Sequence, residues 1–425
     1  MDLSFTARNV LIGASLLGLT GGVLGCFAVL RRQSLLGDAL AHAALPGICV
    51  GYLLTHSKEP APLFAGALVA GLIGSMTIQL IIRNSRIKQD TAIGMVLSVF
   101  FGVGIVLLTY IQKLPLGNQS GLDHFLFGQA ATLLPRDIRI MGVMAVVVVL
   151  VTTLLFKELK LLCFDRDFAD ATGQPTRWLE FLLTTLLVVV VVVGLQTVGV
   201  VLIVATLITP AAAARQWTER LGVMLVLAAL IGGGSGAVGA LLSASVPNLP
   251  TGPVIVLCAS AVLIVSLLVA PRRGLVWAFL EERRVTRRIR RENLLKDLYT
   301  WGERNNGRWT DPVPATFIMG LRGQSGTQLT QTAGRLRSRG LLTPVADGML
   351  LTDRGLSAAE GVVRKHRLWE LYLTRRLELP SDHVHRDAET MEHALTEEDV
   401  AALEKVLGHP QADPHGRPIP PRRAA

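Results

Sequence analysis

Charged residues are scarce in this chain of 425 residues. They make up 17% of it, against about a quarter in soluble globular proteins, whereas hydrophobic residues make up 50%. The four cysteines stand alone, without a Cys-x-x-Cys pair, which excludes a disulfide scaffold and a zinc ribbon. No Gly-x-x-x-x-Gly-Lys-Ser/Thr motif occurs, so the chain lacks a phosphate-binding loop for ATP hydrolysis. The composition therefore predicts a membrane protein, and no motif in the chain predicts that it hydrolyses ATP itself.

Long apolar runs fill the first 270 residues. Each spans roughly 17 to 22 residues, the length that crosses about 30 Å of hydrocarbon. They predict an all-α polytopic domain over 1–272 with about nine transmembrane helices. Because 122–137 also reads as a short re-entrant or interfacial helix, about eight or ten spans are alternatives. The predicted spans are 10–30, 35–55, 62–82, 91–111, 138–156, 178–195, 197–214, 222–243 and 253–270.

Basic residues predict the orientation, because Lys and Arg are retained on the cytoplasmic side. Alternate loops differ in their share of these residues. The richer set is Arg31, Arg32, Arg83, Arg86, Lys88, Lys157, Lys160, Arg166, Arg177, Arg215 and Arg220. We therefore expect a multi-pass protein of the cell membrane with its N-terminus outside and its C-terminal domain in the cytoplasm.

Two polar residues interrupt the second apolar run. Asp38 and His42 are four residues apart and thus share one helical face, where a carboxylate and an imidazole can reach one metal ion. Pro46 lacks an N–H, which leaves the carbonyl of His42 free. A central Asp costs roughly 2.5 to 3.5 kcal/mol in a bilayer, which favours a function for it. The alternative is that Asp38 caps the helix and His42 bonds to it.

These residues lie in a stretch, Arg31 to Gly47, that resembles the permeases of zinc, manganese and iron ABC importers; Val198 to Ala214 is similar to a late span of that family. The resemblance covers 1–272. It implies that Asp38 and His42 contact the metal in the permeation path. It also implies a separate cytosolic ABC ATPase, an extracytoplasmic metal-binding protein and a second permease, identical or not, as partners in the bilayer.

The segment 157–177 is the longest predicted cytoplasmic connection. It carries Phe164, Asp165, Asp167 and Gly173, which we expect to dock the ATPase and couple it to transport. A solvated connector is the alternative.

After 272 the composition becomes that of a soluble protein. A basic linker, 273–291, carries six arginines between Arg283 and Arg291, and anionic lipid headgroups attract such a run. The pattern over 292–352 predicts three helices and a two-stranded wing with Asp347-Gly348 at its turn, a winged helix-turn-helix. Arg335, Arg337 and Arg339 on its third helix either contact DNA phosphates or keep the domain soluble.

Histidines and carboxylates gather in the last part, 353–425. His366 and Glu370 are four residues apart on one predicted helix. After Pro380 a second helix carries further ligand-type side chains on one face: His385, Glu389, Glu392 and His393. Imidazoles and carboxylates without thiolates suit Mn²⁺, Fe²⁺ or Zn²⁺. The alternative is an exposed charged face.

The stretch from 292 to 420 resembles the metal-dependent repressors of the diphtheria-toxin-repressor type, including their helical metal-binding and dimerisation domain. The resemblance implies that six residues are metal ligands: His366, Glu370, His385, Glu389, Glu392 and His393. Glu389 stands where iron-responsive members have Cys, which favours manganese, and Asn293 stands where the family has a Met or Asp ligand.

Two functions remain open from the sequence. The first is a permease for Mn²⁺ or Fe²⁺, with Zn²⁺ as a further candidate, whose fused cytosolic domain senses the metal and regulates import. The second is a membrane-tethered, metal-dependent transcription regulator that binds DNA. Nine spans with an Asp/His pair exceed what a tether needs, which favours the first.

Overall fold

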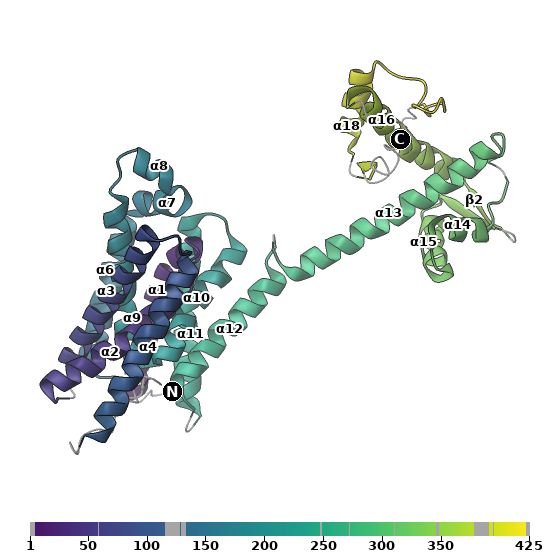
Figure 1. Ribbon diagram of the computed structural model, residues 1–425. Helices are drawn as coiled ribbons and strands as arrows, with labels where there is room; N and C mark the ends of the chain where they lie inside the picture. Colours follow the sequence, from purple (N-terminus) through teal and green to yellow (C-terminus); the bar gives the residue numbers. More distant parts are fainter. Residues whose placement is uncertain are drawn as a thin grey trace. The chain divides into compact units, whose positions relative to one another are not determined.

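The computed structural model describes residues 5–57, 59–114, 128, 133–246, 249–271, 273–309, 311–345, 348–377, 391–393 and 395–421. The chain forms two compact units, Met1–Trp277 and Ala278–Ala425, and each is described by itself (Figure 1). The expected helical architecture, with a small wing in the second unit, is confirmed.

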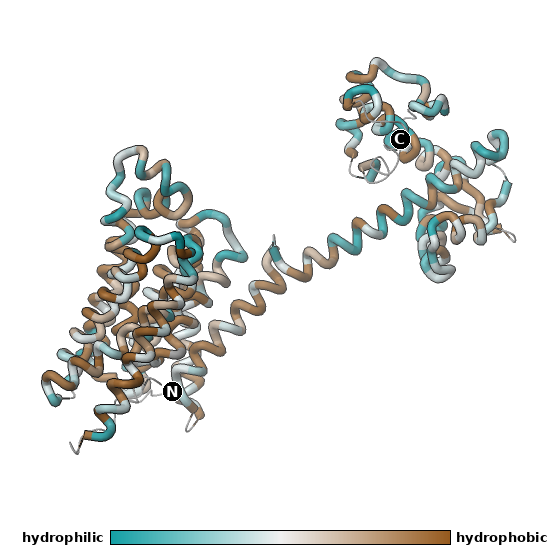
Figure 2. Tube along the Cα trace, in the orientation of Figure 1, coloured by the Kyte–Doolittle hydropathy of each residue, from teal (hydrophilic) through white to brown (hydrophobic). Residues whose placement is uncertain are grey.

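The first unit is a bundle of long helices. Hydrophobic residues run along nearly their full length (Figure 2). In chain order its helices are α1 (Phe5–Leu30), α2 (Leu36–Thr55), α3 (Pro60–Asn84), α4 (Gln89–Lys113), α6 (Pro135–Leu154), α7 (Phe156–Phe164), α8 (Arg166–Ala171), α9 (Thr176–Val198), α10 (Val200–Trp217), α11 (Leu221–Ser245) and α12 (Thr251–Val269).

Eight helices in the described part of the chain are long and apolar enough to cross a membrane. They are α1, α2, α3, α4, α6, α9, α11 and α12, and each coincides with a predicted span. The ninth predicted span, 197–214, coincides with α10, which is not among the eight. Most of 122–137, where the sequence left a short helix open, lies outside the described residues.

Gly199 alone separates α9 from α10. Its φ of 86° and ψ of 167° belong to a backbone region that only glycine occupies readily, so a residue with a side chain would be strained there. The chain can therefore end one helix and begin the next within one residue.

Glycines let the central helices approach closely. A Cβ built on Gly18 of α1 would lie 2.1 Å from the carbonyl oxygen of Gly232 on α11, and one on Gly22 would lie 2.3 Å from that of Ala228. A Cβ on Gly47 of α2 would likewise lie 2.1 Å from the carbonyl oxygen of Gly66 on α3. Small residues thus place α2 deep in the bundle, where 78% of its apolar window is buried.

The second unit begins within one continuous helix, α13 (Leu275–Arg304), so the basic segment 283–291 is helical. The rest of the unit consists of α14 (Ala315–Arg322), α15 (Gly326–Ser338), β1 (Leu342–Val345), β2 (Gly348–Leu351), α16 (Asp353–Arg376) and α18 (Glu397–Leu407). The strands are antiparallel with Val345 opposite Gly348, which confirms the wing, whereas Asp347 lies outside the described residues.

Two apolar cores hold this unit together. Leu294 and Leu298 of α13 pack with Ile318 of α14 and Leu336 of α15 in the first. Leu368 and Leu371 of α16 pack with residues of α18 in the second. Helix α16 contributes to both cores through its two ends. It therefore places His366 and Glu370 between the winged-helix part and the C-terminal part.

Candidate metal sites

Asp38 and His42 lie on one face near the start of α2. His42 Nε2 is 3.4 Å from Asp38 Oδ1. The side chain of Asp38 is 33% exposed and that of His42 18%, so both are within reach of an ion from outside this single chain. The spacing predicted from the sequence is thus realised as a pair of adjacent side chains.

The imidazole of His42 is held from α4. Its ring meets that of Phe101 edge to face, with centroids 4.7 Å apart. Its Nδ1 is buried and has no hydrogen-bond partner among the described residues. A buried polar atom without a partner costs about 1 to 3 kcal/mol, so this nitrogen is suited to receive a ligand.

Capping explains the position of Asp38 poorly. Leu35 is the residue at the cap position of α2, and no side chain caps it. Asp38 instead lies in the first turn, where a negative charge is favoured by the helix dipole. The second part of the structural alternative, an interaction between His42 and Asp38, agrees with their 3.4 Å separation.

Segment 157–177 is more ordered than a simple loop, because it contains α7 and α8. Asp165 caps α8 by accepting a hydrogen bond from the backbone N–H of Phe168 at 2.9 Å. Phe164 and Phe168 are 54% and 56% exposed, and Asp167 is also exposed. Gly173 lies in the turn after α8 and has a φ of 78°. An exposed aromatic pair on short helices is a surface suited to contact another protein.

In the second unit the structure brings four of the six predicted ligands together. His366 Nε2 lies 3.1 Å from Glu370 Oε1, and His366 Nδ1 lies 2.5 Å from Glu392 Oε2. His393 Nε2 lies 3.5 Å from Glu392 Oε1. All four side chains are buried, which argues against an exposed charged face. The other two, His385 and Glu389, lie outside the described residues.

A lysine that the sequence analysis did not single out lies inside this cluster. Lys296 Nζ from α13 is 2.8 Å from Glu392 Oε2 and 3.0 Å from His366 Nδ1, and its side chain is 10% exposed. No local sequence pattern indicated this contact, because Lys296 and Glu392 are 96 residues apart in the chain.

Neighbouring residues of α13 hold His393. Its Nδ1 lies 2.6 Å from Glu292 Oε2 and its Nε2 lies 3.2 Å from Asn293 Oδ1. Asn293, where the repressor family has a Met or Asp, thus contacts a predicted ligand rather than lying apart from it.

Neighbouring charged groups shift the pKa values of His366 and Glu392. Burial by itself lowers the pKa of the His366 imidazole, but its hydrogen bonds to Glu370 and Glu392 outweigh burial and raise that pKa above its ordinary value. Burial likewise raises the pKa of Glu392, but His366 and the positive charge of Lys296 outweigh it and lower that pKa. The result is an imidazole and an ammonium arranged about a buried carboxylate.

The donor set fits a divalent metal in its chemistry, and Glu392 Oε1 is a buried oxygen without a hydrogen-bond partner among the described residues. Within the described ranges, however, no three His, Cys, Asp or Glu side chains are arranged to hold a metal ion. The ammonium of Lys296 contacts two of the groups that a metal would need. A metal bound by these groups would have to replace the Lys296 ammonium.

The third helix of the winged part presents its basic residues to solvent. Arg335, Arg337 and Arg339 are all exposed at the end of α15, whereas Leu336 between them is buried in the core. This arrangement leaves the three guanidinium groups available for contact with phosphates.

A bundle of apolar helices with an Asp/His pair, joined to a winged helix and a buried cluster of ligand-type side chains, defines a membrane transport protein with a regulator-like domain. Residues 4–270 match the model of the ABC 3 transport family. Residues 352–421 match that of the iron dependent repressor, metal binding and dimerisation domain. The chain belongs to the ABC 3 transport family and carries a repressor-type domain after its membrane part, which confirms both resemblances.

Relatives and a solved structure agree with this assignment. The manganese transport system membrane protein MntC of Bacillus subtilis is 43% identical over 371 residues, which cover 87% of this chain and 84% of that protein. The zinc transport system membrane protein TroC of Treponema pallidum is 49% identical over 282 residues, covering 66% and 95%. The structure of PsaBC from Streptococcus pneumoniae in complex with Fab has a TM-score of 0.57 and 35% identity, covering 66% and 95%.

Proposed function

We propose that the chain is the permease subunit of an ATP-driven importer of divalent transition metal ions, and that Asp38 and His42 bind the ion as it passes. The observation that carries this proposal is the pair itself: a carboxylate and an imidazole 3.4 Å apart on a buried helix, with one imidazole nitrogen buried and unpaired among the described residues. In a membrane helix such groups are retained for a polar pathway.

We propose Mn²⁺ as the transported ion, with Fe²⁺ and Zn²⁺ as the alternatives. Oxygen and imidazole ligands without thiolate suit Mn²⁺ and Fe²⁺, and imidazole also suits Zn²⁺. The names of two relatives, a manganese and a zinc transport protein, support a metal of this group.

The pair supplies fewer ligands than such an ion takes. The carbonyl of His42, opposite Pro46 in α2, water and a second permease are the further donors that we propose. The partial exposure of both side chains in the single chain supports a path that a second permease, identical or related, completes. An extracytoplasmic metal-binding protein delivers the ion, and the N-terminus lies outside and the C-terminal domain in the cytoplasm.

A separate cytosolic ABC ATPase supplies the energy, and it docks on α7 and α8. The exposed rings of Phe164 and Phe168 support this contact, as do Asp165 and Asp167 beside them and the turn at Gly173. Nucleotide-driven movement of the ATPase then reaches the membrane helices through α8 and α9, which only a short turn separates.

The repressor-type domain senses cytosolic metal through His366, Glu370, His385, Glu389, Glu392 and His393, and it regulates import. The metal supplies a divalent charge that holds these ligands together. Lys296 also contacts two of these groups, since its ammonium lies between His366 and Glu392. Regulation follows if the metal-bound domain favours one transport state over another.

Uptake of ⁵⁴Mn²⁺ by a deletion strain tests the permease. Complementation with Asp38→Asn or His42→Gln should leave uptake at the background of the empty vector, because each change removes a ligand while it preserves volume. The matched control is Asp90→Asn, which removes an exposed carboxylate from the first turn of α4. Normal uptake by both variants at wild-type protein levels would reject the permeation site. Growth on manganese, iron or zinc alone identifies the ion.

A membrane-tethered DNA-binding regulator is the second candidate, and the exposed Arg335, Arg337 and Arg339 favour it. If α15 contacts phosphates, each arginine changed to Gln weakens DNA binding by the full-length protein and lowers its salt dependence. A gel-shift assay with upstream DNA, with and without Mn²⁺, decides between DNA binding and metal sensing alone.

A further inference from the structure

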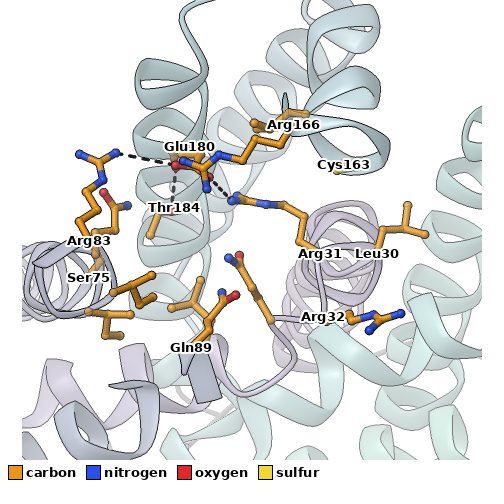
Figure 3. A pocket seen from close by; sticks show the side chains of 16 residues that line it. Leu30, Arg31, Arg32, Ser75, Arg83, Gln89, Cys163, Arg166, Glu180 and Thr184 are labelled. Atoms are coloured by element: carbon orange, nitrogen blue, oxygen red, sulfur yellow. Dashed lines mark hydrogen bonds and ion pairs between the residues drawn. The ribbon is translucent and has the colours of Figure 1, made fainter. Parts of the chain in front are cut away.

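A cavity with many polar side chains in its wall lies where the ends of several helices of the membrane unit meet. It has a volume of about 310 Å³ and opens beside the end of α1, the end of α3, the start of α8 and the first turns of α9 (Figure 3). Amide groups line part of it, from Gln33, Gln79 and Gln89. A cavity of this polarity differs from the apolar interfaces that fill the rest of the bundle.

One buried carboxylate in the wall receives three guanidinium groups. Arg31 Nη2 lies 2.5 Å and Arg166 Nη1 3.0 Å from Oε1 of Glu180, and Arg83 Nη2 lies 3.9 Å from its Oε2. Figure 3 shows these side chains converging on Glu180 from three separate segments, whereas Arg32 points away from it. Arg31 and Arg32, which are adjacent in the sequence, therefore point in different directions.

The charges do not balance. Glu180 is the one acidic side chain among the residues that line the cavity, and it faces three arginines. Asp170 lies 4.0 Å from Arg166 but is 53% exposed and outside the lining. The side chains of Glu180 and Arg31 are 8% and 11% exposed, whereas those of Arg83 and Arg166 are 44% and 50% exposed, so the excess positive charge faces the open side of the cavity.

The arginines also have donors to spare. A guanidinium carries five N–H groups. In the part of the chain that the structure describes, the Arg31 side chain donates to one acceptor, Glu180. Arg31 and Arg166 both contact Oε1 of Glu180 and line the cavity, and guanidinium groups that share a site in this way can bind a tetrahedral oxyanion through paired hydrogen bonds.

We propose that this cavity binds a phosphate group, with Arg31, Arg83 and Arg166 as its ligands and Glu180 as the internal counter-charge that orients them. The phosphate belongs either to the headgroup of an anionic lipid or to a free phosphate. The place of the cavity, at the ends of membrane helices, is compatible with both sources. Since Arg166 begins α8, a bound anion would also fasten α8 to α1 and α3.

Thermal unfolding of the full-length protein tests the proposal, because a ligand that binds the folded state raises the unfolding temperature. The first arm compares sodium phosphate with sodium chloride at equal ionic strength, in detergent with EDTA. The second arm compares nanodiscs of phosphatidylcholine with nanodiscs that also contain phosphatidylglycerol, in phosphate-free buffer. A rise in the first arm identifies free phosphate, and a rise confined to the second identifies a lipid headgroup.

Two arginine variants locate the effect. Arg83→Gln and Arg166→Gln should each weaken anion binding about tenfold or more, as expected for one lost charged hydrogen bond. Arg86→Gln is the matched control, since Arg86 is exposed, lies three residues beyond Arg83 and is not part of the cavity wall. Its binding should equal that of the wild type.

Glu180→Gln separates a binding site from an ion-pair cluster that merely holds the helices. If the cavity binds an anion, this variant loses stability in chloride but regains it in phosphate or phosphatidylglycerol, with tighter binding than the wild type. If the cluster is only structural, the variant is destabilised equally in all conditions. That result, the absence of a rise in both wild-type arms, or an equal loss in Arg83→Gln and Arg86→Gln would overturn the proposal.

Discussion

The ammonium of Lys296 on α13 lies 2.8 Å from the carboxylate of Glu392, at the centre of the cluster where the repressor-type domain would hold its metal. Both side chains are nearly buried, with exposed fractions of 10% and 0%. A cation supplied by the chain itself thus neutralises a carboxylate that water cannot reach. A divalent ion at the proposed site would therefore compete with Lys296 for this carboxylate.

Replacement of Lys296 should raise the affinity for metal and lower the stability of the metal-free protein. In Lys296→Met the ammonium no longer competes, so we expect the affinity for Mn²⁺ to rise about tenfold or more. The metal-free form should lose roughly 3 to 5 kcal/mol locally, because the partner of a buried charge is gone. Calorimetric titration of the full-length protein measures the affinity, in an Asp38→Asn, His42→Gln background that silences the membrane pair.

The control for this change is Lys405→Met, which removes an exposed lysine from α18. It should alter neither the affinity nor the stability. Unchanged Mn²⁺ binding in Lys296→Met would show that the metal does not displace the ammonium.

We expect Pro46 to affect transport because it lacks a backbone N–H, and not because of the packing of its ring. In Pro46→Ala the new N–H can bond to the carbonyl of His42 and complete the helix, which stabilises α2. If that carbonyl is a metal ligand, uptake of ⁵⁴Mn²⁺ should fall several-fold while the unfolding temperature stays the same or rises. Pro210→Ala makes the same change inside α10 and should leave uptake unaffected. Equal uptake by both variants would exclude the carbonyl as a ligand.

The packing of α1 on α11 should tolerate no added methyl group at Gly18. Its Cβ would lie 2.1 Å from the carbonyl oxygen of Gly232, so Gly18→Ala should destabilise the membrane unit by about 1 to 3 kcal/mol. Gly234→Ala, with nothing within 4 Å of its Cβ, should instead be neutral or stabilising by up to about 1 kcal/mol, the helix propensity of Ala. Unfolding in detergent compares the two; similar values would contradict the close approach.

The aromatic pair on α7 and α8 should couple the ATPase to transport. Phe164→Ala and Phe168→Ala remove exposed rings and should leave the fold stable. The purified complex should then show reduced metal-stimulated ATP hydrolysis, by about tenfold if these rings are anchors of the interface. Trp178→Ala removes an exposed ring from α9 as a control. Full stimulation in both Phe variants would place the docking surface elsewhere.

The amino-acid sequence could predict whatever depends on local periodicity. The length of each apolar run indicated the membrane helices, because a helix must be long enough to cross the hydrocarbon and must satisfy its backbone within itself. The four-residue spacing of Asp38 and His42, and of His366 and Glu370, likewise placed each pair on one face.

The tertiary structure alone decided which distant charges meet. Lys296 and Glu392 are 96 residues apart and Arg31 and Glu180 are 149 apart, in segments whose own patterns show only ordinary charged positions. It also decided that 157–177 folds as two short helices, since their stability comes from packing rather than from a long periodic pattern. Contacts between side chains on different helices follow from how the helices pack, which no local pattern contains.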